Sequence, residues 1–270
     1  MAINSKIQWT KATWNPWHGC KKVSEGCKYC YMYRDKDRYG HDPTEVLRSK
    51  TKFNAPLKWA EASLIFTCSW SDFFIQEADL WRDEAWDIIR RTPRHTYQIL
   101  TKRPERIAEC LPEDWGEEGY PNVWMGISAE TQQNLDRRLP HLLNVPAQVR
   151  FISAEPLLEY VNLLDAGMVA DSPLNDRPLV DWVIIGGESG NDTGKWKYRP
   201  CEAEWIQNMV MDCQALDIPY FIKQLGTHLA TKVYHLSDRH GGDLKEWPTI
   251  LTDPSAIGNP RQMPKIYQHV

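Results

Sequence analysis

The chain has 270 residues, 42% of them hydrophobic, and a formal net charge of −4. No stretch approaches the roughly 20 apolar residues that span a bilayer, so we expect no membrane segment. The small net negative charge excludes a generic binder of polyanions, yet residues 1–60 carry twelve Lys or Arg against five Asp or Glu. This local excess of positive charge favours an anionic ligand near the N-terminal third of the chain.

The cellular compartment is predicted from the N-terminus and from cysteine usage. Residues 1–14 contain no apolar core of the kind found in signal peptides. Four of the seven cysteines are isolated in the sequence, which is not typical of a disulfide framework. They are Cys68, Cys110, Cys201 and Cys213. We therefore expect a cytoplasmic protein with free thiols.

Short apolar runs alternate with helical stretches along the chain. The runs are mostly apolar throughout, as strands buried on both faces of a parallel sheet are. They span 64–68, 96–100, 122–127, 149–153, 181–187 and 219–223, and a further short strand is expected before Cys20. Helices are predicted over 77–92, 131–144 and 201–217, and Pro140 predicts that the second is kinked or split. In the first helix, one face is expected to hold Leu80, Trp81, Ala85, Ile88 and Ile89.

This alternation is typical of βαβ units. It predicts an α/β fold, namely a full or partial (β/α)6-7 TIM-like barrel over residues 1–226. Residues 164–180 are polar and contain proline, so they are interpreted as an inserted loop. From residue 227 the pattern changes, and Gly241-Gly242-Asp243 lies between two strand-like runs. We expect residues 227–270 to form a C-terminal β-hairpin and an extended tail packed on the barrel.

Each predicted strand is followed by polar residues, which in a barrel meet at the end that carries the active site. They include Ser69, Lys102, Ser128, Glu130, Glu155, Glu188 and Lys223. The turn from Gly186 to Gly190 adds glycines, which allow close backbone approach and can hold an anion. It is not the glycine pattern of a dinucleotide-binding fold. The sequence therefore predicts one polar cavity shared by the strand ends.

Three cysteines lie close together in the sequence, with the spacing C-x6-C-x2-C: Cys20, Cys27 and Cys30. A zinc site would need a fourth ligand, for which His18 and His41 are the nearby candidates. An iron–sulfur cluster held by only three cysteines would leave one iron open for another ligand. A redox-active pair of Cys27 and Cys30 is the third interpretation.

The segment from Trp14 to Tyr31 resembles the cluster loop of the radical S-adenosylmethionine (radical SAM) superfamily. In that superfamily three cysteines bind a [4Fe-4S] cluster, and an aromatic residue at the position of Tyr29 contacts adenine. The usual spacing there is C-x3-C-x2-C, so the first gap in this chain is three residues longer.

The chain is also similar to an outlying group of that superfamily, the phage-associated three-Cys-motif family of uncharacterised proteins. The resemblance runs from Ile7 to about Gly226. It lies in the segments ILTKRPERI, NVWMGISAE, FISAEPLLE, WVIIGGESG and PYFIKQLG, together with the cysteine loop.

The resemblance implies a barrel of radical SAM type and a division of roles among the residues named above. Cys20, Cys27 and Cys30 would hold the cluster, and SAM would take the open iron. Cofactor contacts would come from Tyr29, Ser69, Ser128, Glu130, Gly186, Gly187 and Glu188. Glu155, Lys223 and Lys102 would serve catalysis near the substrate.

The implied reaction begins when the reduced cluster cleaves SAM to methionine and a 5′-deoxyadenosyl radical, which takes a hydrogen atom from the substrate. An electron donor such as a flavodoxin or ferredoxin is expected. The basic N-terminal third and the abundant aromatic residues favour a nucleic acid or a nucleotide as substrate, to be modified or repaired.

Two other functions remain open at this stage. The first is a zinc-stabilised barrel that binds nucleic acid without redox activity. The second is a metal-free barrel hydrolase that uses Glu130, Glu155 or Glu188 as acid and base.

Overall fold

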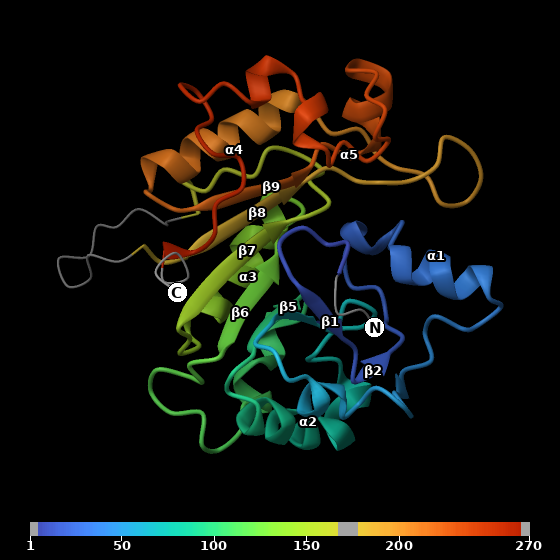
Figure 1. Ribbon diagram of the computed structural model, residues 1–270, viewed down its shortest axis with the longest axis vertical. Helices are drawn as coiled ribbons and strands as arrows, with labels where there is room; N and C mark the ends of the chain where they lie inside the picture. The colour runs from blue at the N-terminus through green and yellow to red at the C-terminus, as the bar shows by residue number, and fades with distance from the viewer. Residues whose placement is uncertain (1–4, 167–177, 266–270) are drawn as a thin grey trace. The chain divides into compact units, whose positions relative to one another are not determined.

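The computed structural model describes residues 5–166 and 178–265 (Figure 1). The chain divides into two compact units, which are treated separately below. The first contains residues 1–127 and 138–150, and the second contains residues 128–137 and 151–270. Most of the predicted inserted loop at 164–180 falls outside the described residues.

Four parallel strands build the first unit. Neighbouring strands follow the order β1 (Ala12–Trp14), β4 (Leu64–Thr67), β5 (Thr96–Thr101) and β6 (Val123–Ser128), whose last residue belongs to the second unit. The register pairs Ala12 with Ile65, Leu64 with Thr96, and Tyr97 with Val123. Every residue of β4 and β6 is buried, as expected for strands covered on both faces. The predicted strands at 64–68, 96–100 and 122–127 are thus confirmed.

The first unit also carries a small antiparallel pair, β2 (Trp17–His18) with β3 (Leu47–Arg48), on either side of the cysteine loop and α1 (Tyr31–Arg38). Its other long helix is α2 (Asp79–Arg91). Short 3-10 turns lie at Glu25–Cys27, Ala55–Lys58, Gln76–Ala78, Pro104–Arg106 and Ala108–Cys110.

Aromatic side chains dominate the core of the first unit. The Trp86 ring lies 4.8 Å from Phe73 and 5.3 Å from Trp115, both edge-on. The predicted inner face of α2 is partly wrong, because Leu80 is 88% exposed and Arg82 and Trp86 are buried instead. Residues 82, 85, 86 and 89 follow the i, i+3, i+4, i+7 spacing of one helix face, and position 80 falls off it.

Three parallel strands build the second unit, in the order β7 (Val149–Ala154), β8 (Trp182–Gly186) and β9 (Tyr220–Gln224). Helix α4 (Ala203–Ala215) packs on β8 and β9 (Figure 1), and its buried residues include Ile206, Met209 and Val210. Helix α3 (Gln132–Leu143) spans the boundary between the units in the sequence. It is one helix rather than two, and Pro140, inside its last turn, removes one i→i−4 hydrogen bond without ending the helix there.

The predicted C-terminal β-hairpin is wrong. Among residues 227–265, the structure has the short helix α5 (Gly226–His228), a π-helical turn at Leu229–Val233, and 3-10 turns at Leu244–Glu246 and Thr249–Leu251. The Gly-Gly-Asp segment closes on Asp238, whose carboxylate accepts from the N–H groups of His240, Gly242 and Asp243. An aspartate-centred turn therefore replaces the two-residue hairpin turn.

The α/β class is confirmed in both units. In each, neighbouring strands of the parallel set follow chain order, an arrangement compatible with a partial TIM-like barrel. Across the part of the chain that the structure describes, every helix is too short or too polar to cross a membrane.

Candidate functional site

The cysteine loop of the first unit is fixed where it leaves β2. Gly19 has φ +96°, and a Cβ atom there would lie 2.0 Å from the Glu45 carbonyl oxygen, so only glycine fits. Its N–H donates to Trp70 O at 3.0 Å, and its carbonyl accepts from Ser71 Oγ at 2.6 Å. Residues 69–72, which follow β4, therefore hold the start of the loop in place.

The three thiols of this loop gather around Tyr33. All are free, with Cys27 buried and Cys20 and Cys30 half-buried. Burial, together with the nearby Cys20, Cys30 and Cys27, raises the pKa of the Tyr33 hydroxyl to about 12. The same hydroxyl donates to Cys20 O at 2.5 Å. The three sequence-predicted cysteines thus all affect the pKa of the same hydroxyl, and their role as metal ligands stays a prediction.

Burial raises the pKa of two thiols of the loop, Cys20 and Cys30, which favours their protonated form. For Cys20, burial and the nearby Asp72 raise the pKa and Arg103 offsets part of the rise, with a net pKa of about 12. Burial also raises the pKa of Cys30, which Lys102 lowers in part. Because only thiolates bind metals, loading this loop would release protons.

Arg103 and Asp72 are the residues that the sequence prediction missed. The Arg103 guanidinium donates from Nη1 to Asp72 Oδ2 at 3.1 Å and to Cys20 Sγ at 3.7 Å, and from Nη2 to Lys21 O at 2.7 Å. Asp72 also accepts from Thr101 Oγ1 at 2.7 Å and from Lys102 N at 2.9 Å. These bonds tie the ends of β4 and β5 to the cysteine loop. The only sequence signal was the position of both residues just after a predicted strand.

The three cysteines of the loop are the residues that could hold a metal ion or a cluster, and all three are free thiols. Within the described residues, no three His, Cys, Asp or Glu side chains are placed to share one metal ion. Cysteine thiolates are ligands of zinc and of iron–sulfur clusters alike, so the donor type by itself fits both.

The other predicted residues of the first unit lie around the same loop. Tyr29 is half-buried, and Lys28 Nζ lies 5.2 Å from the centre of its ring. The Ser69 hydroxyl contacts the Asn15 amide at 3.0 Å, and its carbonyl accepts from the Tyr31 hydroxyl. Lys102 is close enough to Cys30 to affect its pKa. The structure thus brings Tyr29, Ser69 and Lys102 to the cysteine loop.

A second polar group lies at the strand ends of the second unit. Lys223, at the end of β9, donates to Glu155 Oε1 at 2.8 Å, just after β7. Gly186 ends β8 beside this pair, and a Cβ atom there would lie 2.7 Å from Glu155 Oε1. The two residues predicted to serve catalysis in this unit are therefore paired with each other.

Glu188 is paired with Arg199, a residue that the sequence prediction did not include. The carboxylate is 7% exposed. It accepts from Arg199 Nη2 at 2.5 Å and from Nε at 2.9 Å, which makes a two-point pair. The Arg199 backbone N–H donates to the same carboxylate at 2.8 Å. Glu188 therefore anchors the loop that runs from Gly190 to Arg199.

The glycines of this turn allow backbone to pack on backbone. A Cβ atom on Gly187 would lie 2.2 Å from Leu225 O. The Gly187 N–H donates to Gln224 O at 3.1 Å, and the Gly190 N–H donates to Thr227 Oγ1 at 3.2 Å. These two N–H groups are thus used within the unit rather than held ready for an anion.

Ser128 and Glu130 lie at the end of β6 and are buried. The Glu130 carbonyl accepts from Leu158 N at 3.1 Å, so its backbone is joined to the segment after β7. Both residues belong to the second unit, together with Glu155, Glu188 and Lys223.

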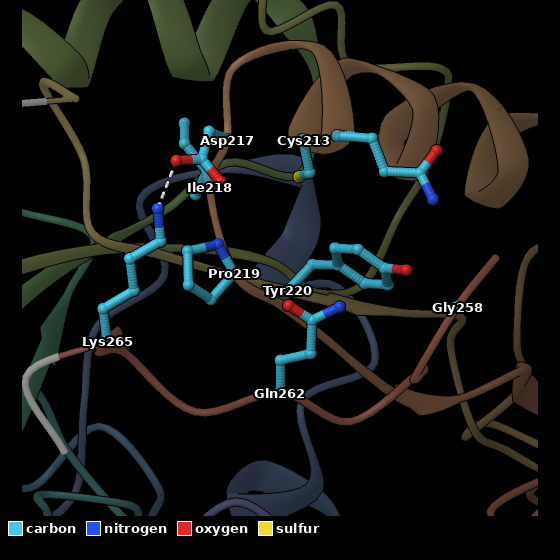
Figure 2. Close-up of a pocket in the computed structure, with 9 residues that line it drawn as sticks. Cys213, Asp217, Ile218, Pro219, Tyr220, Gly258, Gln262 and Lys265 are labelled. Atoms are coloured by element: carbon cyan, nitrogen blue, oxygen red, sulfur yellow. Dashed lines mark hydrogen bonds and ion pairs between the residues drawn. The ribbon is translucent and has the colours of Figure 1, made fainter. Parts of the chain in front are cut away.

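A cavity of about 300 Å³ lies at the opposite end of β9 from Lys223 (Figure 2). It is lined by Cys213, Gln214, Asp217, Ile218, Pro219, Tyr220, Gly258, Gln262 and Lys265. Tyr220 begins β9 and Lys223 stands near its end. In parallel α/β sheets, ligands bind outside the carboxyl ends of the strands, so this cavity is not part of the candidate site.

Together, the fold and this geometry define an α/β protein with parallel strands and a three-thiol loop at the strand ends. The chain belongs to the DUF5131 family, described as proteins of unknown function, which matches residues 4–250. Searches of curated proteins and of solved structures found no match.

Proposed function

We propose that this protein is a radical SAM enzyme that holds a [4Fe-4S] cluster on Cys20, Cys27 and Cys30. The observation that carries the proposal is the set of three free thiols around Tyr33, at the carboxyl end of parallel strands. The cluster, when bound with SAM, supplies one-electron cleavage of SAM and thereby a radical that takes hydrogen from a substrate.

The protein's own residues would orient the cofactor and exclude water. Tyr29 offers a half-buried ring beside Cys30 for the adenine. Within the same unit, the hydroxyl of Ser69 is the proposed polar contact of SAM. Lys102 places a positive charge near the cysteine loop.

The pair of Glu155 and Lys223 is the proposed catalytic group on the substrate side. An ion pair at 2.8 Å can exchange its partners for a polar substrate without leaving a charge unpaired in the empty site.

A nucleic acid or a nucleotide is the proposed substrate class. Two tyrosines of the basic N-terminal third are exposed, Tyr31 by 42% and Tyr39 by 66%. The Arg38 guanidinium lies 5.9 Å from the Tyr39 ring centre. Exposed aromatic rings beside cations are suited to stacking on bases while contacting phosphates.

Metal and sulfide analysis after anaerobic reconstitution tests the proposed function. We expect about four irons per chain in the wild type and a large loss of iron in Cys30→Ala. Cys213→Ala is the matched control, because Cys213 is a buried thiol on α4, outside the loop. One zinc per chain would favour the zinc-stabilised binding barrel. A wild type without iron, or one unable to cleave SAM after reduction with dithionite, would rule out the enzyme.

The substrate class has its own test, a gel-shift titration with single-stranded nucleic acid at several salt concentrations. We expect binding to weaken as salt rises, and Tyr39→Ser to weaken it by about tenfold at fixed salt, since one stacked base contributes about 1–3 kcal/mol. Leu80→Ser is the control, because Leu80 is also an exposed apolar residue, on α2, and carries no aromatic ring. Binding that is insensitive to salt and to Tyr39→Ser would contradict a nucleic-acid substrate.

A further inference from the structure

Arg103 is a permanent positive charge in the interior of the first unit. It is 7% exposed, and it stands just beyond Lys102, the first residue after β5. Burying a charged side chain is unfavourable unless its hydrogen bonds are made by other groups. The partners of Arg103 therefore indicate why the charge is there.

Two of its partners fix the guanidinium, and the third is a sulfur atom. Asp72 Oδ2 and Lys21 O, at 3.1 and 2.7 Å, supply the charge balance and a strong backbone acceptor. The remaining contact is to Cys20 Sγ at 3.7 Å. The guanidinium thus presents an N–H group and a positive charge to one of the three thiols.

Asp72 fixes the position of the Arg103 guanidinium by accepting its hydrogen bond. It is buried, and its carboxylate accepts from Thr101 Oγ1 at 2.7 Å and from Lys102 N at 2.9 Å. Residues behind a metal ligand commonly orient the ligand and tune the metal. Here a series of hydrogen bonds runs from the end of β5 to Asp72, from Asp72 to Arg103, and from Arg103 to the Cys20 sulfur.

We propose that Arg103 is a positioning residue for Cys20 that makes the bound cluster easier to reduce. This inference rests on the proposed function, because it concerns a cluster held by the loop. A reduced cluster carries one more negative charge than an oxidised one. A fixed positive charge that donates to its cysteine sulfur therefore stabilises the reduced form more than the oxidised form.

Arg82 provides a matched control in the same unit. It is 4% exposed, and it also donates to one carboxylate, Asp79 Oδ1 at 2.6 Å. Its other bonds go to the carbonyls of Phe73 and Ile75, at 3.0 and 2.7 Å. Both arginines thus donate hydrogen bonds to backbone carbonyls and to a carboxylate, but Arg103 also donates to one of the three cysteines of the loop.

The test is an anaerobic redox titration of the reconstituted full-length protein, followed by electron paramagnetic resonance without SAM. The variants are Arg103→Met, Arg103→Lys and Arg82→Met, with iron content and urea unfolding measured on each. Arg103→Met is expected to lower the ratio of reduced to oxidised cluster about tenfold at a fixed potential, about 59 mV for a one-electron couple. Arg103→Lys keeps the charge and is expected to recover part of this shift.

Arg82→Met is expected to lose about as much unfolding free energy as Arg103→Met and to keep the reduction potential of the wild type. A wild-type potential in Arg103→Met, with iron bound, would overturn the inference and leave the proposed function standing. A wild type that binds no iron would overturn both. If Arg103→Met fails to fold, Arg103→Lys serves as the test. Lysine cannot reproduce the planar guanidinium that donates to Asp72, Lys21 O and Cys20 together, so an unshifted reduction potential in Arg103→Lys would count against the inference.

Discussion

The strand ends of the two units use charge in different ways. In the first unit, the pair of Arg103 and Asp72 is buried, and its bonds run to backbone and to a cysteine sulfur. In the second unit, Glu155 and Lys223 are bonded to each other and are more exposed. The first pair holds a loop in place, and the second can exchange partners with a ligand.

The largest expected effect concerns the backbone that fixes the cysteine loop. Gly19→Ala places a Cβ atom against the Glu45 carbonyl in a left-handed conformation, so we expect a loss of at least about 3 kcal/mol in unfolding free energy. Gly40→Ala has a similar positive φ but open space around it, so strain of only about 1–2 kcal/mol is expected. Urea unfolding of both variants measures the difference. Equal losses would mean that the contact with Glu45 does not fix the loop.

The anchor of the second unit is expected to give the next largest effect. Arg199→Met leaves the Glu188 carboxylate buried without its cation, which is expected to cost about 2–4 kcal/mol. In Lys232→Met the ion pair with Asp192 is lost at the surface, and almost no change is expected. Thermal or urea unfolding at neutral pH compares the two variants. If Arg199→Met were as stable as Lys232→Met, the loop from Gly190 to Arg199 would not depend on Glu188.

The smallest effect concerns pH in the first unit. Burial lowers the pKa of His95, whose Nε2 lies 3.2 Å from Pro56 O. Below about pH 6.5 the unfolded chain binds a proton that the folded chain does not, so stability is expected to fall as pH decreases through this value. The fall ends once the pH is below the pKa of His95 in the folded state.

His95→Gln is expected to reduce this pH dependence while keeping a donor for Pro56 O. Unfolding free energies between about pH 7.5 and 5.5 measure the slope. His18, whose pKa is also lowered by burial, should leave a smaller slope in the variant. An unchanged slope in His95→Gln would show that His95 is not the group responsible.

The strands could be predicted because strands that are buried on both faces consist of consecutive apolar residues. Both β4 and β8 are buried at every position, and the runs at 64–68 and 181–187 located them. The helix face of α2 was harder, because Arg82 is buried through hydrogen bonds to Phe73 O and Ile75 O that no hydrophobic pattern reveals. Likewise, the Asp238 carboxylate accepts a hydrogen bond from the Gly242 N–H, in the segment that was expected to form the turn of a hairpin.

The site could be predicted in its residue types but not in its pairings. The positions of Cys20, Glu155 and Lys223 follow from motif and strand ends. The partners Asp72 and Arg103 are 31 residues apart in sequence, and Arg199 lies 11 residues beyond Glu188 in a polar loop. Pairings over such separations depend on strand order and loop path, which local sequence does not encode.

The central claim is that the cysteine loop holds a cluster with one iron open to SAM. The most direct measurement is electron paramagnetic resonance of the reduced, reconstituted protein before and after SAM is added. We predict a cluster signal that changes in shape when SAM binds and that is absent in Cys30→Ala. A protein that holds about four irons but gives the same spectrum with and without SAM would contradict the claim.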